Sequence, residues 1–273
     1  MIKITLDYNE VTIVIKDFIQ SYFENSGCKG VVIGLSGGVD SAITAILCRR
    51  VLGKNKTYCL FIPDITTPEI DIEHQKILIE KYDLSCKTKN ITEIIKNMTK
   101  TCIIKPEKIA LANMKARIRM VLLYEYANMT NSLVCGTSNK SELLIGYFTK
   151  YGDGAADIMP IGDLYKTQIF QLAEFLKIPR AIIYKRPTAG LIKDQTDEKE
   201  LGFTYEILDK ILIGLEQKQT ISDIAKKNNL KRSDVKKIKF MCIKSQHKRC
   251  YPLIPKISGK TPGFDWRSPI QEG

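Results

Sequence analysis

The sequence contains no apolar run close to the roughly 20 residues that a helix needs to cross a bilayer. It begins without the apolar segment and small-residue cleavage site of a secretory signal peptide. Its eight cysteines include no Cys-x-x-Cys pair, which disfavours zinc binding and sulfur transfer. Histidine occurs only at His74, which we expect on an exposed helix surface, and at His247. These absences predict a cytoplasmic protein with reduced thiols and no membrane partner.

The chain has an excess of positive charge. Its 273 residues are 44% hydrophobic and 26% charged, enough for one large domain or a domain with an appendage. The net charge is +12, and Thr204 to Arg249 alone contain 12 Lys and Arg against 5 Asp and Glu. These lysines alternate with apolar residues at helical spacing and lack aromatic partners for stacking on bases. We interpret the region as solvated helix faces and expect no nucleic-acid partner.

The most informative stretch lies between residues 31 and 52. An unbroken apolar run from Val31 to Leu35 is followed by Ser-Gly-Gly and then by a helix-compatible segment. This order predicts a buried strand, a tight loop and a helix N-terminus, whose N–H groups and dipole favour a phosphate. No Gly-Lys-Ser/Thr follows, so the loop is not a Walker loop.

Strands and helices alternate along the first 176 residues. Apolar runs predict strands at 31–35, 57–62, 84–88 and 132–136, and periodic segments predict helices at 7–25, 41–52, 68–82, 106–127 and 164–176. The alternation predicts right-handed βαβ units and an α/β fold with a doubly wound, Rossmann-like parallel sheet. In such a sheet ligands bind beyond the carboxyl ends of the strands, near a topological switch point.

The remainder of the chain is predicted to be helical with irregular connections. Residues 185–200 are irregular and charged, residues 203–247 predict helices with breaks near Thr220 and Asn229, and Phe264 and Trp266 suggest a docking tail. We predict an α/β domain over residues 1–190. Residues 191–273 would form a loop, a helical region and the tail of the same compact unit.

Several motifs resemble one enzyme family. Ser36-Gly-Gly-Val-Asp-Ser41 resembles the pyrophosphatase loop of enzymes that split ATP into AMP and pyrophosphate. The other motifs are Gly136-Thr-Ser-Asn-Lys-Ser-Glu142, Gly146-Tyr-Phe-Thr-Lys-Tyr-Gly-Asp-Gly154, Asn113-Met-Lys-Ala-Arg-Ile-Arg-Met120, Pro187-Thr-Ala189 and His247-Lys-Arg249. In their order and approximate spacing they are similar to the NAD⁺ synthetase family, over residues 7 to 267. The resemblance implies the adenine nucleotide alpha hydrolase-like form of the α/β fold.

The resemblance also implies a reaction. The nicotinate carboxylate of nicotinic acid adenine dinucleotide (deamido-NAD⁺) attacks the α-phosphorus of ATP, and ammonia then displaces AMP to give NAD⁺. The chain has no room for a glutaminase domain, which implies the ammonia-dependent form. A homodimer with the dinucleotide site at the subunit interface is implied as well. Many bacterial members carry Gly-Thr-Asp-His-Ala-Ala-Glu in place of the Ser-Asn-Lys form at residues 136–142.

The resemblance assigns candidate residues to each ligand. ATP-binding positions are Gly34, Leu35, Ser36, Gly37, Gly38, Val39, Asp40, Ser41, Thr137, Lys166 and Thr188. Deamido-NAD⁺-binding positions are Arg117, Lys150, Asp157, His247 and Lys248. Asp40 and Glu142 are the implied Mg²⁺ ligands, and both follow glycine-ended strands that should meet at one sheet edge. The expected catalytic residues are Asp40, Lys166, which would neutralise phosphate charge, and Asp153, which would place ammonia or metal.

Two other interpretations fit parts of the sequence. Another ATP pyrophosphatase, such as a tRNA-modifying thiolase or a lysine–tRNA ligase, would share the loop, and the basic C-terminal region would suit RNA. That alternative leaves residues 136–166 unexplained. A non-catalytic nucleotide sensor or RNA-binding module is the other, and it would need neither Asp40 nor Glu142.

Overall fold

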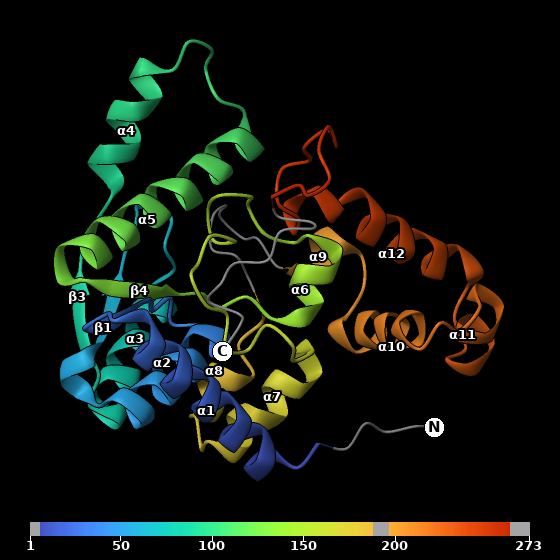
Figure 1. Ribbon diagram of the computed structural model, residues 1–273, viewed down its shortest axis with the longest axis horizontal. Coiled ribbons are helices and arrows are strands. Elements are labelled where there is room, and N and C mark those ends of the chain that lie inside the picture. Colours follow the sequence, from blue (N-terminus) through green and yellow to red (C-terminus); the bar gives the residue numbers. More distant parts are fainter. Residues whose placement is uncertain (1–5, 188–196, 263–273) are drawn as a thin grey trace.

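A computed structural model describes residues 6–187 and 197–262 (Figure 1). Its centre is a four-stranded parallel sheet in the order β3-β2-β1-β4. The strands are β1 (Gly30–Gly34), β2 (Thr57–Phe61), β3 (Ser85–Thr88) and β4 (Ser132–Cys135). The predicted α/β fold and all four predicted strands are confirmed. Thr188 and the docking tail at Phe264 and Trp266 lie outside the described residues.

Helices cover both faces of the sheet (Figure 1). One face packs against α1 (Tyr8–Ser26), α2 (Val39–Leu52), α3 (Glu69–Tyr82) and α7 (Lys166–Phe175), and the other against α4 (Thr92–Thr101) and α5 (Lys108–Thr130). Val31 and Ile33 point into the first core, whereas Val32 and Val134 point into the second. Because successive strand residues face opposite sides, an all-apolar strand is what two covered faces require.

Helix α3 corrects one prediction. We expected His74 on an exposed surface, but its side chain is only 2% exposed. Asp71, His74, Gln75 and Leu78 recur at helical spacing, and they are the buried face of α3. The prediction was wrong because three of these four residues are polar, so the buried face has no apolar stripe to reveal it.

The second half of the chain is mostly helical. It contains α6 (Lys140–Ile145), α8 (Arg180–Ile183), α9 (Asp197–Leu201), α10 (Tyr205–Glu216), α11 (Ile221–Lys227) and α12 (Arg232–Lys244). Two short 3₁₀ turns are η1 (Lys54–Lys56) and η2 (Gln246–Lys248). Thr220 caps α11 and Asn229 has a left-handed φ of 52°, so both predicted breaks are confirmed.

The C-terminal helices build a core of their own. Leu208, Ile211 and Ile238 pack with Ile145 at the end of α6 and with Tyr165, which precedes α7. The irregular stretch that we predicted to reach Glu200 ends earlier, because α9 begins at Asp197. Three acidic residues in its first turn suit the positive end of the helix dipole. The division at residue 190 stays a prediction.

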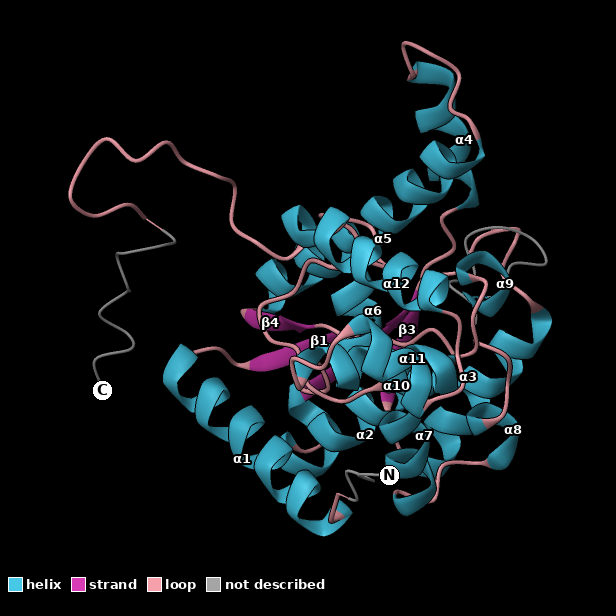
Figure 2. Cartoon of the chain, turned by 90° about the vertical axis from the view of Figure 1, so that its right-hand side faces the viewer, coloured by secondary structure: helices cyan, strands magenta, loops and turns pink. Residues whose placement is uncertain are grey.

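Two further features concern the outside of the protein. Figure 2 shows α4 and the loop after it projecting from the body of the protein, with Ile103 and Ile104 exposed. Within residues 6–187 and 197–262, no helix is both long and apolar enough to cross a membrane.

Candidate active site

The strand order creates a switch point between β1 and β4. From β1 the chain continues to β2 and β3 on one side and returns to β4 on the other. The loops that follow β1 and β4 therefore diverge from neighbouring strands and leave a crevice between them. A cleft of about 270 Å³ lies there, and its walls include Ser36, Gly38, Gly136, Thr137 and Asp153. The predicted meeting of the two glycine-ended strands is confirmed.

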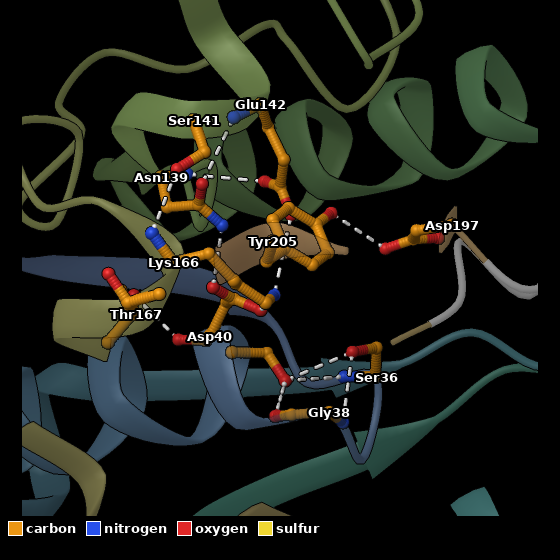
Figure 3. Close-up of polar contacts among 12 residues, drawn as sticks. Ser36, Gly38, Asp40, Asn139, Ser141, Glu142, Lys166, Thr167, Asp197 and Tyr205 are labelled. Carbon is orange, nitrogen blue, oxygen red and sulfur yellow. Dashed lines mark hydrogen bonds and ion pairs between the residues drawn. The ribbon is translucent and has the colours of Figure 1, made fainter. Parts of the chain in front are cut away.

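The loop after β1 is held ready for an anion. The Ser36 N–H donates to Ser41 Oγ at 3.1 Å, and the Gly38 N–H donates to Ser36 Oγ at 3.3 Å (Figure 3). Gly37 has a φ of 81°, and a Cβ there would lie 2.5 Å from the carbonyl oxygen of Asp71. Only glycine fits a position with both constraints. The loop is thus rigid before any ligand arrives, and it leads into the N-terminus of α2.

Asp40, Lys166 and Glu142 form one charge cluster beside this loop (Figure 3). Lys166 Nζ lies 2.5 Å from Asp40 Oδ2 and 3.5 Å from Glu142 Oε1. Asn139 Nδ2 donates to Asp40 Oδ1 at 2.9 Å. Asn139 also caps α6: its Oδ1 accepts from the Glu142 N–H, and the Glu142 carboxylate accepts from the Asn139 N–H. This capping box fixes both side chains. The lysine is only 2% exposed, which rules out a solvated surface residue.

The cluster holds too little positive charge for its carboxylates. Burial raises the pKa of Glu142 to about 8, and the charge of Asp40 adds to this while Lys166 opposes it. Burial would lower the pKa of Lys166, but Asp40 and Glu142 outweigh it and raise that pKa above its ordinary value. In this arrangement a single ammonium serves two carboxylates and lies closer to Asp40 than to Glu142. A further cation would relieve the desolvation of Glu142.

Buried hydrogen bonds from the C-terminal helices hold the start of α7. The Lys166 N–H donates to Ser141 Oγ at 2.9 Å, and Ser141 Oγ donates to Asp209 Oδ1 at 2.5 Å. The Thr167 N–H donates to Asp209 Oδ2 at 2.8 Å. Hydrogen bonds to a buried carboxylate are worth about 1.5–3 kcal/mol each. Asp209 of α10 therefore fixes the backbone that carries Lys166.

The cleft is also lined by two cations that the sequence did not identify. Arg119 lines the cleft, donates from Nε to the Ile62 carbonyl at 2.9 Å, and contacts buried Asp64 at 3.0 Å through Nη2. Its only signal in the sequence was a charge that interrupts an apolar helix. Lys185 lines the cleft beside Ser36 and pairs with Asp71 of α3. No sequence pattern marked that pair.

The five predicted deamido-NAD⁺ positions lie outside the lining of this cleft. Arg117 is exposed, and its Nε and Nη2 each donate to the Lys150 carbonyl at 3.3 Å. Lys248 Nζ donates to the carbonyls of Gly146 and Phe148 at 2.7 and 2.8 Å. His247 is exposed on η2. Of the predicted positions, Arg117 therefore contacts Lys150. Lys248 contacts the loop that begins at Gly146.

Two carboxylates of the 148–163 segment differ in their surroundings. Asp157 accepts from the Val134 N–H at 2.7 Å and from the Tyr124 hydroxyl at 3.2 Å, so it ties the loop to β4 and α5. Asp153 accepts from the Thr149 N–H at 2.9 Å and lines the cleft at both the loop and the charge cluster. Of the two, Asp153 faces the space that a ligand would occupy.

Comparison with known proteins follows from this geometry. Residues 11–252 match the family described as NAD synthase. The NH(3)-dependent NAD(+) synthetase of Sulfurisphaera tokodaii is 43% identical, over 99% of this chain and 97% of the relative. The NH(3)-dependent NAD(+) synthetase of Archaeoglobus fulgidus is 44% identical, over 92% of this chain and 98% of the relative.

Solved structures agree. The NH3-dependent NAD synthetase from Campylobacter jejuni, in complex with the nitrate ion, has a TM-score of 0.78 at 36% identity, covering 92% of this chain and 100% of that one. NMN synthetase from Francisella tularensis has a TM-score of 0.83 at 33% identity, covering 93% of this chain and 100% of that one. With its phosphate-binding loop, its buried charge cluster and these relatives over nearly its whole length, the chain belongs to the NAD synthase family.

Proposed function

We propose that this protein catalyses the ATP-dependent amidation of deamido-NAD⁺ by ammonia, forming NAD⁺, AMP and pyrophosphate through an NAD-adenylate. The observation that carries the proposal is the buried cluster of Lys166, Asp40 and Glu142 beside the phosphate-binding loop. Such a site suits adenylyl transfer, in which positioning and charge neutralisation do most of the chemistry. The relatives at 43–44% identity are NH(3)-dependent NAD(+) synthetases, which favours this acceptor over the tRNA acceptors considered above.

Magnesium fits the carboxylates at the starts of α2 and α6. Asp40 and Glu142 offer hard oxygen ligands, and they share one buried lysine although Glu142 is strongly desolvated. Held by Asp40 and Glu142, the ion would supply positive charge to the leaving pyrophosphate. The donor set is therefore consistent with Mg²⁺ as the cofactor.

The protein side chains divide the remaining work. The loop from Ser36 to Ser41 binds the phosphates, and Thr137, which lines the same cleft, contacts ATP. Lys166 stabilises the charge that develops on phosphate oxygens while the nicotinate carboxylate displaces pyrophosphate. Asp153 is placed at the cleft wall to orient the ammonia that displaces AMP.

Activity is expected from purified protein given ATP, Mg²⁺, deamido-NAD⁺ and an ammonium salt. NAD⁺, AMP and pyrophosphate should form in equal amounts, measured by chromatography. Glutamine alone should not replace ammonium. Folded protein that makes no NAD⁺ under these conditions would contradict the proposal.

A second acceptor has one observation in its favour. The structure described as NMN synthetase has the same fold at a TM-score of 0.83. Nicotinic acid mononucleotide carries the same reacting carboxylate as deamido-NAD⁺ and lacks only its adenylate half. The assay should therefore run both acceptors side by side, and a kcat/KM that favours the mononucleotide would select the second activity.

We also propose a homodimer joined through the outer face of α5. Arg117 and Val121 lie one turn apart on that face, and Val121 is 57% exposed. A partner covering this face would bury the exposed apolar residues and close the dinucleotide site. Light scattering should give twice the chain mass of 31.0 kDa. Val121→Glu should yield monomers with weak deamido-NAD⁺ binding, whereas Val14→Glu on α1 should remain dimeric; the reverse pattern would move the interface to α1.

A further inference from the structure

The buried carboxylate of Asp197 has one oxygen without a hydrogen-bond donor. Asp197 is 4% exposed and begins α9. Its Oδ2 accepts from the Tyr205 hydroxyl at 3.0 Å, but within the described part of the chain no donor reaches Oδ1. A buried acceptor without a donor destabilises the fold, and more so when it is charged. A ligand that donates a hydrogen bond would stabilise this arrangement.

That oxygen belongs to the wall of the active site. Asp197 lines a pocket of about 120 Å³ together with Asp40, Glu142, Lys166 and Tyr147. This volume exceeds the roughly 30 Å³ that one water molecule occupies in the liquid, so a small ligand fits. Asp197 is near enough to Lys166 and Glu142 for their charges to interact. A ligand at Asp197 would thus lie beside the group that handles the phosphates.

Asp197 and Tyr147 offer acceptors to a ligand, in a pocket that Lys166, Lys185 and Arg186 also line. The Tyr147 hydroxyl donates to Glu200 Oε2 at 2.6 Å, and the Tyr205 hydroxyl donates to Asp197 itself. The Tyr147 proton is directed to Glu200, so its phenol oxygen can offer lone pairs to a ligand in the pocket. Together with Asp197 Oδ1, that oxygen gives the pocket wall two acceptors. Ammonium has four N–H donors, no acceptor and one positive charge.

A metal ion fits the same group less well. Mg²⁺ demands near-octahedral coordination by hard oxygens, which one carboxylate oxygen and one phenol oxygen do not provide by themselves. Aromatic faces, by contrast, attract ammonium groups. The Tyr205 ring already has one over it, since Lys166 Nζ is 5.3 Å from its centroid.

We infer that Asp197, with the hydroxyl oxygen of Tyr147, binds the ammonium ion that supplies the nitrogen. The inference rests on the proposed function and deepens it by naming the binding site of one substrate. Asp153 lies on the wall of the same pocket, so ammonium held at Asp197 is near both the charge cluster and the loop.

Asp197→Asn tests this site, because it removes the negative charge of the side chain while keeping its shape. The KM for ammonium should rise at least about 10-fold, since a charged hydrogen bond is worth roughly 1.5–3 kcal/mol. The KM values for ATP and deamido-NAD⁺ should stay within about twofold, as should pyrophosphate release without ammonium. Glu198→Gln, on the same helix, is the matched control, because Glu198 accepts from the Tyr205 N–H and should leave the ammonium KM unchanged.

The outcomes separate the two claims. If the wild type makes NAD⁺ but Asp197→Asn keeps its ammonium KM, the inference is wrong and the proposed function stands. If the wild type makes no NAD⁺, both are wrong. A uniform rise of all three KM values would show a structural role and overturn the inference. Should Asp197→Asn fail to fold, Asp197→Ala repeats the measurement without a polar side chain, and the same ammonium-specific rise is required of it.

Discussion

Lys166→Met is expected to lower kcat by about 10³-fold or more. The side chain keeps its length and loses only the ammonium, which lies 2.5 Å from Asp40 and 3.5 Å from Glu142. A preorganised charge in a water-poor site is worth about 4 kcal/mol to a transition state, which corresponds to roughly 10³ in rate. The loss should appear in pyrophosphate release measured without ammonium, because Lys166 acts on the first step. The KM for ammonium should change little.

The same change tests how the cluster stabilises the fold. Removing one partner of a buried ion pair costs about 3–5 kcal/mol when the remaining charge stays unpaired. Burial already raises the pKa of Glu142 and Lys166 opposes this, so loss of the ammonium favours the protonated form of Glu142 and we expect a smaller loss in a urea titration near pH 7. Lys140→Met is the control. Its Nζ contacts Asp163 and Glu216 at 3.0 Å on the surface, and turnover should stay within about twofold. Retention of a tenth of wild-type kcat by Lys166→Met would contradict the assigned role.

Asp40→Asn is expected to remove most activity while leaving the fold intact. Asparagine keeps an oxygen for the Asn139 Nδ2 donor and fits the helix start, so only the charge is lost. A missing carboxylate weakens the Mg²⁺ site, so the Mg²⁺ concentration for half-maximal turnover should rise at least about 10-fold and kcat should fall about 10²-fold or more. The readouts are a Mg²⁺ titration of turnover and a melting curve.

Asp163→Asn is the matched control for this carboxylate. The Asp163 side chain is 95% exposed and contacts only Lys140 among the ion pairs of the described residues. It should leave both the Mg²⁺ dependence and turnover within about twofold of wild type. Asp40 would lose its place in the metal site if Asp40→Asn required no more Mg²⁺ than the unchanged protein.

The parts of the site that could be predicted are those set by local chemistry and strand ends. The loop from Ser36 to Ser41 can be recognised from its composition, and Glu142 follows a second glycine-ended strand. Parallel strands bring their carboxyl ends to one edge, so the meeting of Asp40 and Glu142 follows from two separate short motifs. The sheet was predictable for a similar reason, because strands covered on both faces are continuous apolar runs.

The parts that could not be predicted depend on contacts between distant segments. Asp209 lies 43 positions after Lys166, on a helix that reads simply as amphipathic, yet it holds the backbone of that lysine through Ser141. The Lys185 pair with Asp71 spans 114 positions. Sequence spacing contains no record of such pairs. Asp197 was overlooked because it lies in a charged stretch that resembled a solvated loop.

The tie between Asp209 and the start of α7 bears on how the protein is made. Synthesis is slow, so the sheet and the loop at Ser36 can fold while α10 is still inside the ribosome. Until α10 arrives, the Lys166 and Thr167 backbone lacks its buried acceptors. A nascent chain would therefore present the loop at Ser36 before the backbone of Lys166 is anchored beside it. The lysine that we assign to charge stabilisation is held in place only after α10 has folded.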